Sequence, residues 1–440
     1  MTQAMEATLE QRTMAKIAWR LLPLIVAIYF VAYIDRTNVS FAAIGMNKDL
    51  GFTAYVYGWG AGIFFLGYFL FEVPSNLILH RFGARVWIAR ILLTWGIISG
   101  LMMFVTGPKS FFVIRFLLGV AEAGFFPGVL LYFTYWFPAV YRARVVSALF
   151  LAVPGSNAVA AALSGALLQL DGVWGLAGWK WMFILESVPA VLLAPVVLAV
   201  LTDRPSLASW LTMGEKQWLE GQLLLERRAI EGARQMTVVQ ALTDGRVVGL
   251  SLVYLTIVTA TYGITFFLPL IVKGHGVSNV MTGLVTAIPY VIGTIGMVIW
   301  AYSSDRRHER RWHFIVGALV AAGGLMALGW PGSLYWAIGA MSVAAIGLYG
   351  SKPAFWPLPS TFLSGTAAAG GIAMVNSIGN LGGFVGPYVV GWIKDTTHSY
   401  AAGLYFLAGC AMVSGIVAWF VVKPTGAVAR RESAQASLPT

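Results

Sequence analysis

The chain has 440 residues, of which 58% are hydrophobic and only 11% are Asp, Glu, Lys or Arg. A soluble globular chain carries about 25% charged residues, so this composition and a mean hydropathy of +0.77 exclude an ordinary soluble protein and indicate an integral membrane protein. The single cysteine, Cys410, excludes a disulfide framework and a cysteine-based metal site. The net charge of +11 is compatible with nucleic-acid binding, but its distribution argues against that class.

Twelve segments are apolar and long enough to cross a bilayer, which takes about 20 residues. The polar start of the chain and the length of the first apolar segment argue against a cleavable signal peptide. The segments fall into two sets of six, at 17–41, 55–79, 86–106, 110–137, 145–169 and 180–201, then at 246–272, 280–303, 313–330, 334–357, 367–392 and 400–422. We therefore predict an all-α integral membrane protein with twelve transmembrane helices in two six-helix pseudo-symmetric bundles around a central cavity.

The predicted organisation follows from these two sets and the polar stretches outside them. The stretch between the sets is rich in charge and predicts a linker with an amphipathic helix around 214–231. The five parts are an N-terminal tail (1–16), an N-terminal bundle (17–201), the linker (202–245), a C-terminal bundle (246–423) and a C-terminal tail (424–440).

The basic residues outside the spans are distributed very unequally between the two sides. With the N-terminus inside, the cytoplasmic segments hold twenty Lys and Arg residues and the opposite side holds five. Because positive loops stay in the cytoplasm, we expect both termini to be cytoplasmic, in a bacterial-type inner (plasma) membrane. The charge is thus explained by topology, and no nucleic-acid partner is expected.

Charged side chains inside the spans are the strongest functional signal. Each costs roughly 2.5–3.5 kcal/mol at the bilayer centre on insertion scales, so such groups usually face a cavity or a partner. They are Asp35 and Arg36 in span 1, Glu72 in span 2, Arg115 and Glu122 in span 4, and Lys352 in span 10. An arginine fork matches a carboxylate, and burial favours the neutral form of an acid. These groups therefore suit a proton–anion symporter, although Asp35–Arg36 and Arg115–Glu122 ion pairs that only stabilise helix packing are the alternative.

Two basic loops occupy matching places in the two halves. The first is Asn76-Leu-Ile-Leu-His80-Arg81-Phe-Gly83-Ala-Arg85, and the second is Ser304-Asp305-Arg306-Arg307. Both resemble the loop motif G-x-x-x-D-R-x-G-R-R of the major facilitator superfamily. The resemblance implies gating roles for Arg81, Arg85, Asp305 and Arg306. The first copy has Asn76 and His80 in place of the motif's Gly and Asp, so it lacks the acid that makes the gating contact in the motif.

Longer motifs are similar to the anion:cation symporter family within that superfamily. They are Tyr-Ile-Asp-Arg-Thr-Asn at 33–38, the segments 67–76, 115–128 and 135–138, and the glycine-rich stretch 376–386. The resemblance covers nearly the whole chain and is closest to carriers of tartrate, phthalate or hydroxyphenylacetate type acids. It implies proton-coupled uptake of a small organic carboxylate.

We assign candidate roles on these grounds. Asp35 and Glu122 are the expected proton-coupling residues, and Arg36 and Arg115 the expected contacts for the substrate carboxylate. Further candidate substrate contacts are Asn380, Asn376, Asn157, Tyr68, Tyr262 and Trp356, while Tyr33 is a candidate for the cavity wall. For Glu72 a structural hydrogen bond or a gate is favoured over proton carriage, and for Lys352 a position at the membrane interface is favoured over binding.

Other classes find less support in the sequence. The histidines show no metal-ligand spacing, no phosphate-binding G-x-x-x-x-G-K-[ST] loop is present, and no nucleophile–base motif indicates an enzyme. We expect no cofactor other than the coupling proton, and a monomer in the bilayer. An exporter or uncoupled facilitator of the same fold and a non-transporting carboxylate sensor remain alternatives. The residues do not decide between tartrate-like, sugar-acid and aromatic substrates.

Overall fold

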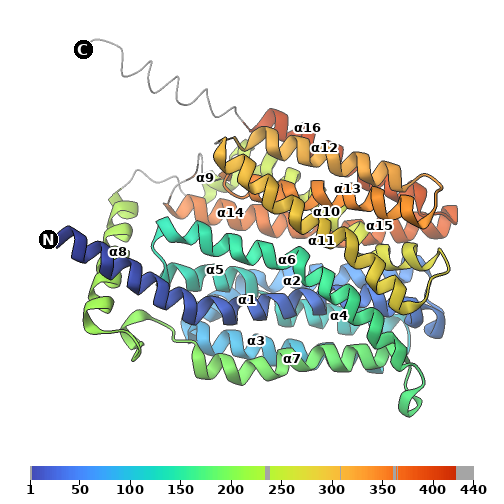
Figure 1. Ribbon diagram of the computed structural model, residues 1–440, viewed down its shortest axis with the longest axis horizontal. Coiled ribbons are helices and arrows are strands. Elements are labelled where there is room, and N and C mark those ends of the chain that lie inside the picture. The colour runs from blue at the N-terminus through green and yellow to red at the C-terminus, as the bar shows by residue number, and fades with distance from the viewer. Residues whose placement is uncertain (1, 233–237, 308, 360–362, 364, 423–440) are drawn as a thin grey trace, which may run out of the picture.

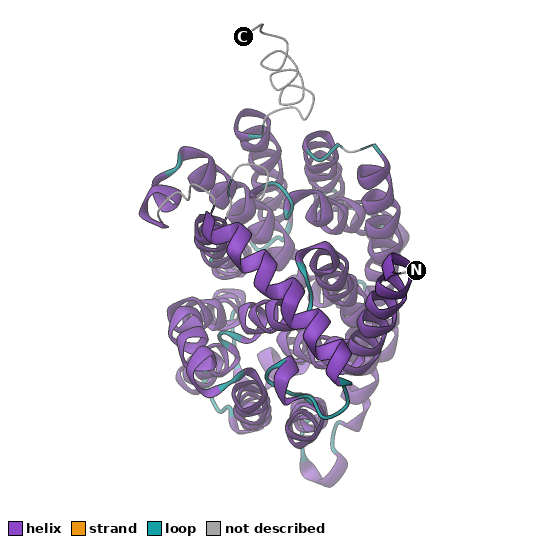
Figure 2. Cartoon of the chain, turned by 90° about the vertical axis from the view of Figure 1, so that its left-hand side faces the viewer, coloured by secondary structure: helices purple, strands orange, loops and turns teal. Residues whose placement is uncertain are grey.

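The computed structural model describes residues 2–232, 238–307, 309–359, 363 and 365–422, and in these residues it is helical, without a β-strand (Figure 2). The first six spans are formed by α1 (Thr2–Leu50), α2 (Ala54–Phe82), α3 (Ala84–Leu101), α4 (Pro108–Glu122), α5 (Phe125–Trp136), α6 (Ala139–Leu167) and α7 (Gly178–Val200). The linker contains α8 (Met213–Gly232) and α9 (Val238–Thr243). The last six spans are formed by α10 (Gly245–Lys273), α11 (Asn279–Arg306), α12 (Arg311–Leu328), α13 (Leu334–Phe355), α14 (Gly365–Asn380), α15 (Gly382–Thr397) and α16 (Ala401–Val421).

The helices form two bundles that lie side by side (Figure 1). We call α1–α7 the N-terminal half and α10–α16 the C-terminal half. Helix α8 lies across one end of the bundle (Figures 1 and 2), which we call the α8 side; the other end is the far side. The predicted C-terminal tail, 424–440, lies outside the described residues.

Side chains that point away from the bundle are largely apolar, as a bilayer requires because it offers no partners to polar groups. Leu192, Ile299 and Phe420 expose 63%, 62% and 79% of their surface, respectively. Eleven stretches within the described residues are long and apolar enough to span a membrane, with α4 and α5 together forming one of them. The remaining predicted span, 367–392, is divided between α14 and α15, and with it the fold has twelve spans.

Two spans that we expected to be continuous are interrupted. The predicted span 110–137 breaks between α4 and α5, where Gly124 has φ +82°, a left-handed conformation that glycine adopts without steric cost. A side chain at Gly124 would also meet the Ser75 hydroxyl at 2.4 Å. The break between α14 and α15 lies in the glycine-rich stretch, and a Cβ at Gly382 would lie 2.4 Å from the Leu255 carbonyl oxygen on α10. Hydropathy alone shows neither break because the apolar character continues through both.

The two halves are in close contact on the far side. There the backbones approach so closely that a Cβ on Gly58 of α2 would lie 2.2 Å from the Pro387 carbonyl oxygen of α15. Likewise, a Cβ on Gly165 of α6 would lie 2.8 Å from the Gly283 Cα of α11. The Asp395 carboxylate accepts hydrogen bonds from the first two backbone N–H groups of α2, at 3.0 and 2.8 Å. Small residues thus let the helices of opposite halves pack tightly in lipid.

On the α8 side, the linker helix is held to the N-terminal half. Lys16 of α1 forms an ion pair with Glu215 at 2.9 Å, and Arg142 at the start of α6 forms one with Glu226. Glu226 also accepts a hydrogen bond from the Ala139 backbone N–H at 3.1 Å. These contacts join α8 to two helices of the same half.

Candidate functional site

Adjacent side chains Asp35 and Arg36 point in different directions from α1. Successive helical residues are turned by about 100°, and the two groups find different partners. Asp35 points into the N-terminal half, is 1% exposed, and accepts hydrogen bonds from Trp95, Ser99 and Asn38. Three donors therefore surround a carboxylate that lies away from the space between the halves.

Arg36 points toward the interface between the halves. Its Nη2 forms an ion pair with the Glu122 carboxylate of α4, and its Nη1 donates to the Tyr262 hydroxyl of α10 at 3.2 Å. The guanidinium also lies over the rings of Tyr33 and Tyr68, at 4.9 and 5.6 Å from their centroids. One arginine thus contacts an acid of its own half and a hydroxyl of the other half.

The break after α4 positions Glu122. It is the last residue of α4, and the left-handed Gly124 starts α5 in a new direction. Glu122 is 1% exposed, and its ion pair with Arg36 links two helices that both contribute to a pocket.

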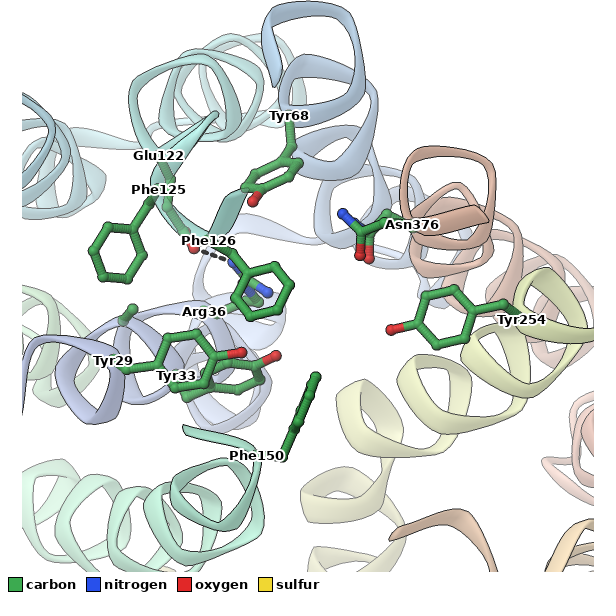
Figure 3. Close-up of a pocket in the computed structure, with 12 residues that line it drawn as sticks. Tyr29, Tyr33, Arg36, Tyr68, Glu122, Phe125, Phe126, Phe150, Tyr254 and Asn376 are labelled. Carbon is green, nitrogen blue, oxygen red and sulfur yellow. Dashed lines mark hydrogen bonds and ion pairs between the residues drawn. The ribbon is translucent and has the colours of Figure 1, made fainter. Parts of the chain in front are cut away.

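The pocket lies between the two halves and is mostly aromatic (Figure 3). In the close-up, the Arg36–Glu122 pair lies on one side, and Tyr254 and Asn376 of the C-terminal half lie across from it. The lining residues are Tyr29, Ala32, Tyr33, Arg36, Tyr68, Glu122, Phe125, Phe126, Phe150, Tyr254, Asn376 and Asn380. An aromatic pocket with a few polar groups from both halves is the kind of site that binds a small ligand.

Six predicted residues meet in this pocket: Arg36, Glu122, Tyr68, Asn376, Asn380 and the expected wall residue Tyr33. Tyr262 adjoins it through its hydrogen bond with Arg36. Trp356 adjoins it by packing against Phe150 and Tyr254, with ring centroids 5.9 and 5.0 Å apart.

Arg115 and Asn157 lie elsewhere. Arg115 is fully buried and donates to the Gly60 and Ala61 carbonyl oxygens of α2 at 3.3 and 3.1 Å, so it holds α4 against α2. Asn157 of α6 donates to the Tyr349 hydroxyl of α13 at 3.0 Å, which joins the two halves.

The ion-pair alternative paired Asp35 with Arg36 and Arg115 with Glu122, and that pairing is wrong. The observed ion pair joins Arg36 to Glu122. Spacing within each helix places Arg115 and Glu122 on one face, but it does not specify which neighbouring helix that face meets.

Glu72 forms a hydrogen-bonded contact between the halves. Its carboxylate accepts from the Asn376 amide at 2.8 Å and from the Ser377 hydroxyl at 2.9 Å. The hydrogen bond expected for Glu72 is therefore present, and the choice between a structural role and a gate stays a prediction. Asn376 is shared between this contact and the pocket.

The expected gating residues make their observed contacts within one half. The Arg85 backbone N–H donates to Asp203 at 2.8 Å and its side chain donates to the Leu198 carbonyl oxygen at 2.6 Å. Asp305 forms an ion pair with Arg310 at 2.5 Å. Arg81 and Arg306 are exposed. The gating role of all four stays a prediction.

Sequence reasoning missed several residues. Tyr29 precedes Arg36 by seven residues, and this two-turn spacing could have identified it as part of the same face. Phe125, Phe126, Phe150 and Tyr254 carry no signal that distinguishes them from aromatic residues used for packing.

Glu186 of α7 was also missed. It is 3% exposed, accepts from the Ser164 hydroxyl at 2.7 Å, and lies near Asp35 and Asn38. Among the described residues, no group of three or more His, Cys, Asp or Glu side chains is arranged to hold a metal ion.

Two six-span halves with a polar and aromatic pocket between them define a polytopic membrane transporter. Residues 25–387 match the model of the Major Facilitator Superfamily. The chain belongs to this superfamily, and its proteins are transporters and not enzymes.

Relatives and solved structures agree with this assignment. An Agrobacterium vitis protein named "Putative tartrate transporter" is 51% identical over 94% of this chain and 95% of its own length. A "Quinolone resistance transporter" of Acinetobacter baumannii is 43% identical over 94% of this chain and 95% of its own length. A crystal structure of a D-xylose–proton symporter has the same fold, with a TM-score of 0.73 at 17% identity over 92% of this chain and 98% of that one. The predicted resemblance and the twelve-helix fold are confirmed.

Proposed function

We propose that this transporter imports a small organic carboxylate together with protons by alternating access. The observation that carries the proposal is the Arg36–Glu122 ion pair on the pocket lining. The pair supplies an anion-binding group, Arg36, and a proton-binding group, Glu122. The Glu122 carboxylate competes with a substrate carboxylate for the Arg36 guanidinium. The tartrate name of a relative at 51% identity supports a hydroxylated carboxylate as the substrate.

Coupling follows from charge balance at Arg36. While Glu122 is ionised it occupies the guanidinium, and a substrate carboxylate has to displace it. A proton on Glu122 removes that competitor and leaves the arginine fork free to bind the substrate in two-point fashion. Loss of the proton restores the ion pair and expels the anion, so substrate and proton enter and leave together.

We infer that Asp35 is a second proton-binding residue that acts on helix packing. Ionised Asp35 accepts hydrogen bonds from Trp95 and Ser99 of α3. A proton on Asp35 weakens those charge-assisted bonds and loosens α1 from α3. Because Arg36 follows Asp35 on α1, this change is transmitted to the anion site.

The remaining pocket groups orient the substrate. Asn380 and Asn376 offer amide donors and acceptors from the C-terminal half, and Tyr68 and Tyr262 offer hydroxyls close to Arg36. Trp356 forms part of the wall behind Phe150 and Tyr254. The geometry supports Arg36 and not Arg115 as the direct anion contact, because both of the Arg115 hydrogen bonds go to backbone carbonyls.

The membrane orientation is part of the proposal. The excess of Lys and Arg in the segments on the α8 side places that side in the cytoplasm by the positive-inside rule. Both termini are then cytoplasmic, in the inner membrane of a bacterium, and a monomer contains the complete pocket.

Replacement of Glu122 by Gln tests the coupling. In proteoliposomes, E122Q should retain counterflow of labelled L-tartrate but lose accumulation driven by an inward proton gradient, since Gln neither titrates nor competes as an anion for Arg36. Exposed Glu220 of α8 provides the control, and E220Q should accumulate like the wild type. Full accumulation by E122Q across the proton gradient would refute the proton role of Glu122.

Drug extrusion is the second candidate, because a relative at 43% identity is named for quinolone resistance. A proton-coupled importer and an exporter differ in the direction of net flux. If cells that produce the protein exclude a fluorescent quinolone and everted vesicles concentrate it, while L-tartrate uptake is absent, extrusion replaces import.

A further inference from the structure

Lys352 is a half-buried cation that the proposed mechanism does not use. It precedes Trp356 by four residues and follows Tyr349 by three on α13, so all three side chains lie on one face of the helix. That face meets the N-terminal half at two points: Asn157 donates to the Tyr349 hydroxyl at 3.0 Å, and the Phe150 and Trp356 rings stack with centroids 5.9 Å apart. Lys352 therefore lies between two contacts that join α13 to α6.

The depth of Lys352 follows from the same contacts. Trp356 also packs against Tyr254 of α10. Tyr254 is nine residues from the start of α10 and therefore about 14 Å from that end of the helix. Lys352 precedes Trp356 by one helical turn and so lies about 6 Å further toward the far side. These steps place the Lys352 backbone about 20 Å from the α8-side end of α10. The interface position of Lys352 stays a prediction.

Among the described residues, the Lys352 ammonium has no acidic partner. Its Nζ lies 4.9 Å from the centroid of the Tyr349 ring, and no carboxylate of the described residues lies within ion-pair distance of it. Arg36, in contrast, is neutralised by Glu122. An unpaired cation at this depth is costly and marks a binding or transport pathway by default.

We propose that Lys352 binds a second carboxylate of the substrate, so that the transporter selects dicarboxylates over monocarboxylates. Arg36 of the N-terminal half holds one carboxylate and Lys352 of the C-terminal half holds the other. The flexible four-carbon stem of a lysine lets its ammonium follow a ligand. A dianion that bridges the halves also neutralises both cations once Glu122 is protonated. The inference rests on the proposed carboxylate transport and names its substrate class.

The test compares L-tartrate with D-glycerate, a hydroxylated monocarboxylate, in proteoliposomes. Initial uptake rates give KM for each acid in the wild type, Lys352→Met, Lys352→Arg and the exposed control Lys48→Met. We expect Lys352→Met to raise KM for tartrate by roughly 10- to 100-fold, as expected for the loss of a charge-assisted contact, and to change KM for glycerate less than about threefold. Lys352→Arg should retain the tartrate preference, and Lys48→Met should match the wild type.

The possible outcomes distinguish failure of the Lys352 inference from failure of the proposed carboxylate transport. Equal losses for tartrate and glycerate in Lys352→Met, with the wild-type elution profile in gel filtration, would show a structural role and overturn the inference. Wild-type KM values in Lys352→Met would overturn it as well. Wild-type uptake of glycerate without tartrate would overturn the inference and leave carboxylate transport standing. Uptake of neither acid, nor of any carboxylate in a wider panel, would overturn both.

Discussion

The two halves share a six-span architecture but differ in the chemistry of their interiors. The N-terminal half holds an acid–base set made of Asp35, Arg36, Arg115, Glu122 and Glu186. The C-terminal half contributes Lys352 and the neutral amides Asn376 and Asn380. The difference indicates that the two halves have different roles. The N-terminal half binds protons and the first anionic group, and the C-terminal half recognises the rest of the substrate.

The largest effect should come from Arg36. In Arg36→Gln the primary anion contact is lost and Glu122 is left buried without its partner. Removal of one member of a buried charge pair costs about 2–5 kcal/mol, so uptake should fall at least about 100-fold. The measurement is initial uptake of L-tartrate in proteoliposomes.

Arg90 supplies the control within the same half. Its guanidinium lies 3.9 Å from the centroid of the Trp87 ring on α3, away from the pocket. Arg90→Gln should stay within about twofold of the wild type. If Arg36→Gln kept half of the wild-type rate, the assignment of anion binding to the N-terminal half would be lost.

An intermediate effect is expected from Asn380. In Asn380→Ala a neutral hydrogen bond to the substrate is removed, which is worth about 1 kcal/mol, so KM should rise roughly fivefold. The ratio of accumulation to the applied proton gradient should not change, because no proton-binding residue is altered. Thr294→Val is a suitable control in the same half, since the Thr294 hydroxyl bonds only its own helix, to the Tyr290 carbonyl oxygen.

This variant separates the roles of the two halves most sharply. If Asn380→Ala abolished proton-driven accumulation while counterflow continued, coupling would not be confined to the N-terminal half. A rise in KM without a change in accumulation supports the assignment of proton binding to the N-terminal half and substrate recognition to the C-terminal half.

The sequence predicts the fold well because each span carries its own apolar signal. It also reveals Arg36 and Glu122, since charges in apolar spans are conspicuous. It does not reveal that these two pair with each other, because that depends on how α1, α4 and the break at Gly124 pack in space. The pocket positions of Phe150 and Tyr254 cannot be identified from the sequence for a related reason. An aromatic residue that faces a pocket has the same sequence surroundings as one that faces a neighbouring helix.

The smallest effect should come from α8, which Lys16 and Arg142 tie to the N-terminal half. The pKa of Glu215 is lowered: burial opposes the shift, but the Thr212 backbone N–H and the Lys16 ammonium stabilise the carboxylate. A lowered pKa means that the contact stabilises the fold above the ordinary Glu pKa of about 4.3 and that this contribution is lost as the pH falls through the lowered value.

Because Lys16 is partly exposed, the contact between Lys16 and Glu215 is worth no more than about 1 kcal/mol. Glu215→Gln should therefore lower Tm by no more than about 2 °C at pH 7. The difference from the wild type should shrink as the pH falls below about 4.3 and vanish once the pH is below the lowered pKa of Glu215. Exposed Glu220→Gln on the same helix should show no such pH-dependent difference. The KM for L-tartrate should be unchanged in Glu215→Gln, since α8 contributes no residue to the pocket lining; a raised KM would mean that the linker acts on the site as well as on the stability of the half that it joins.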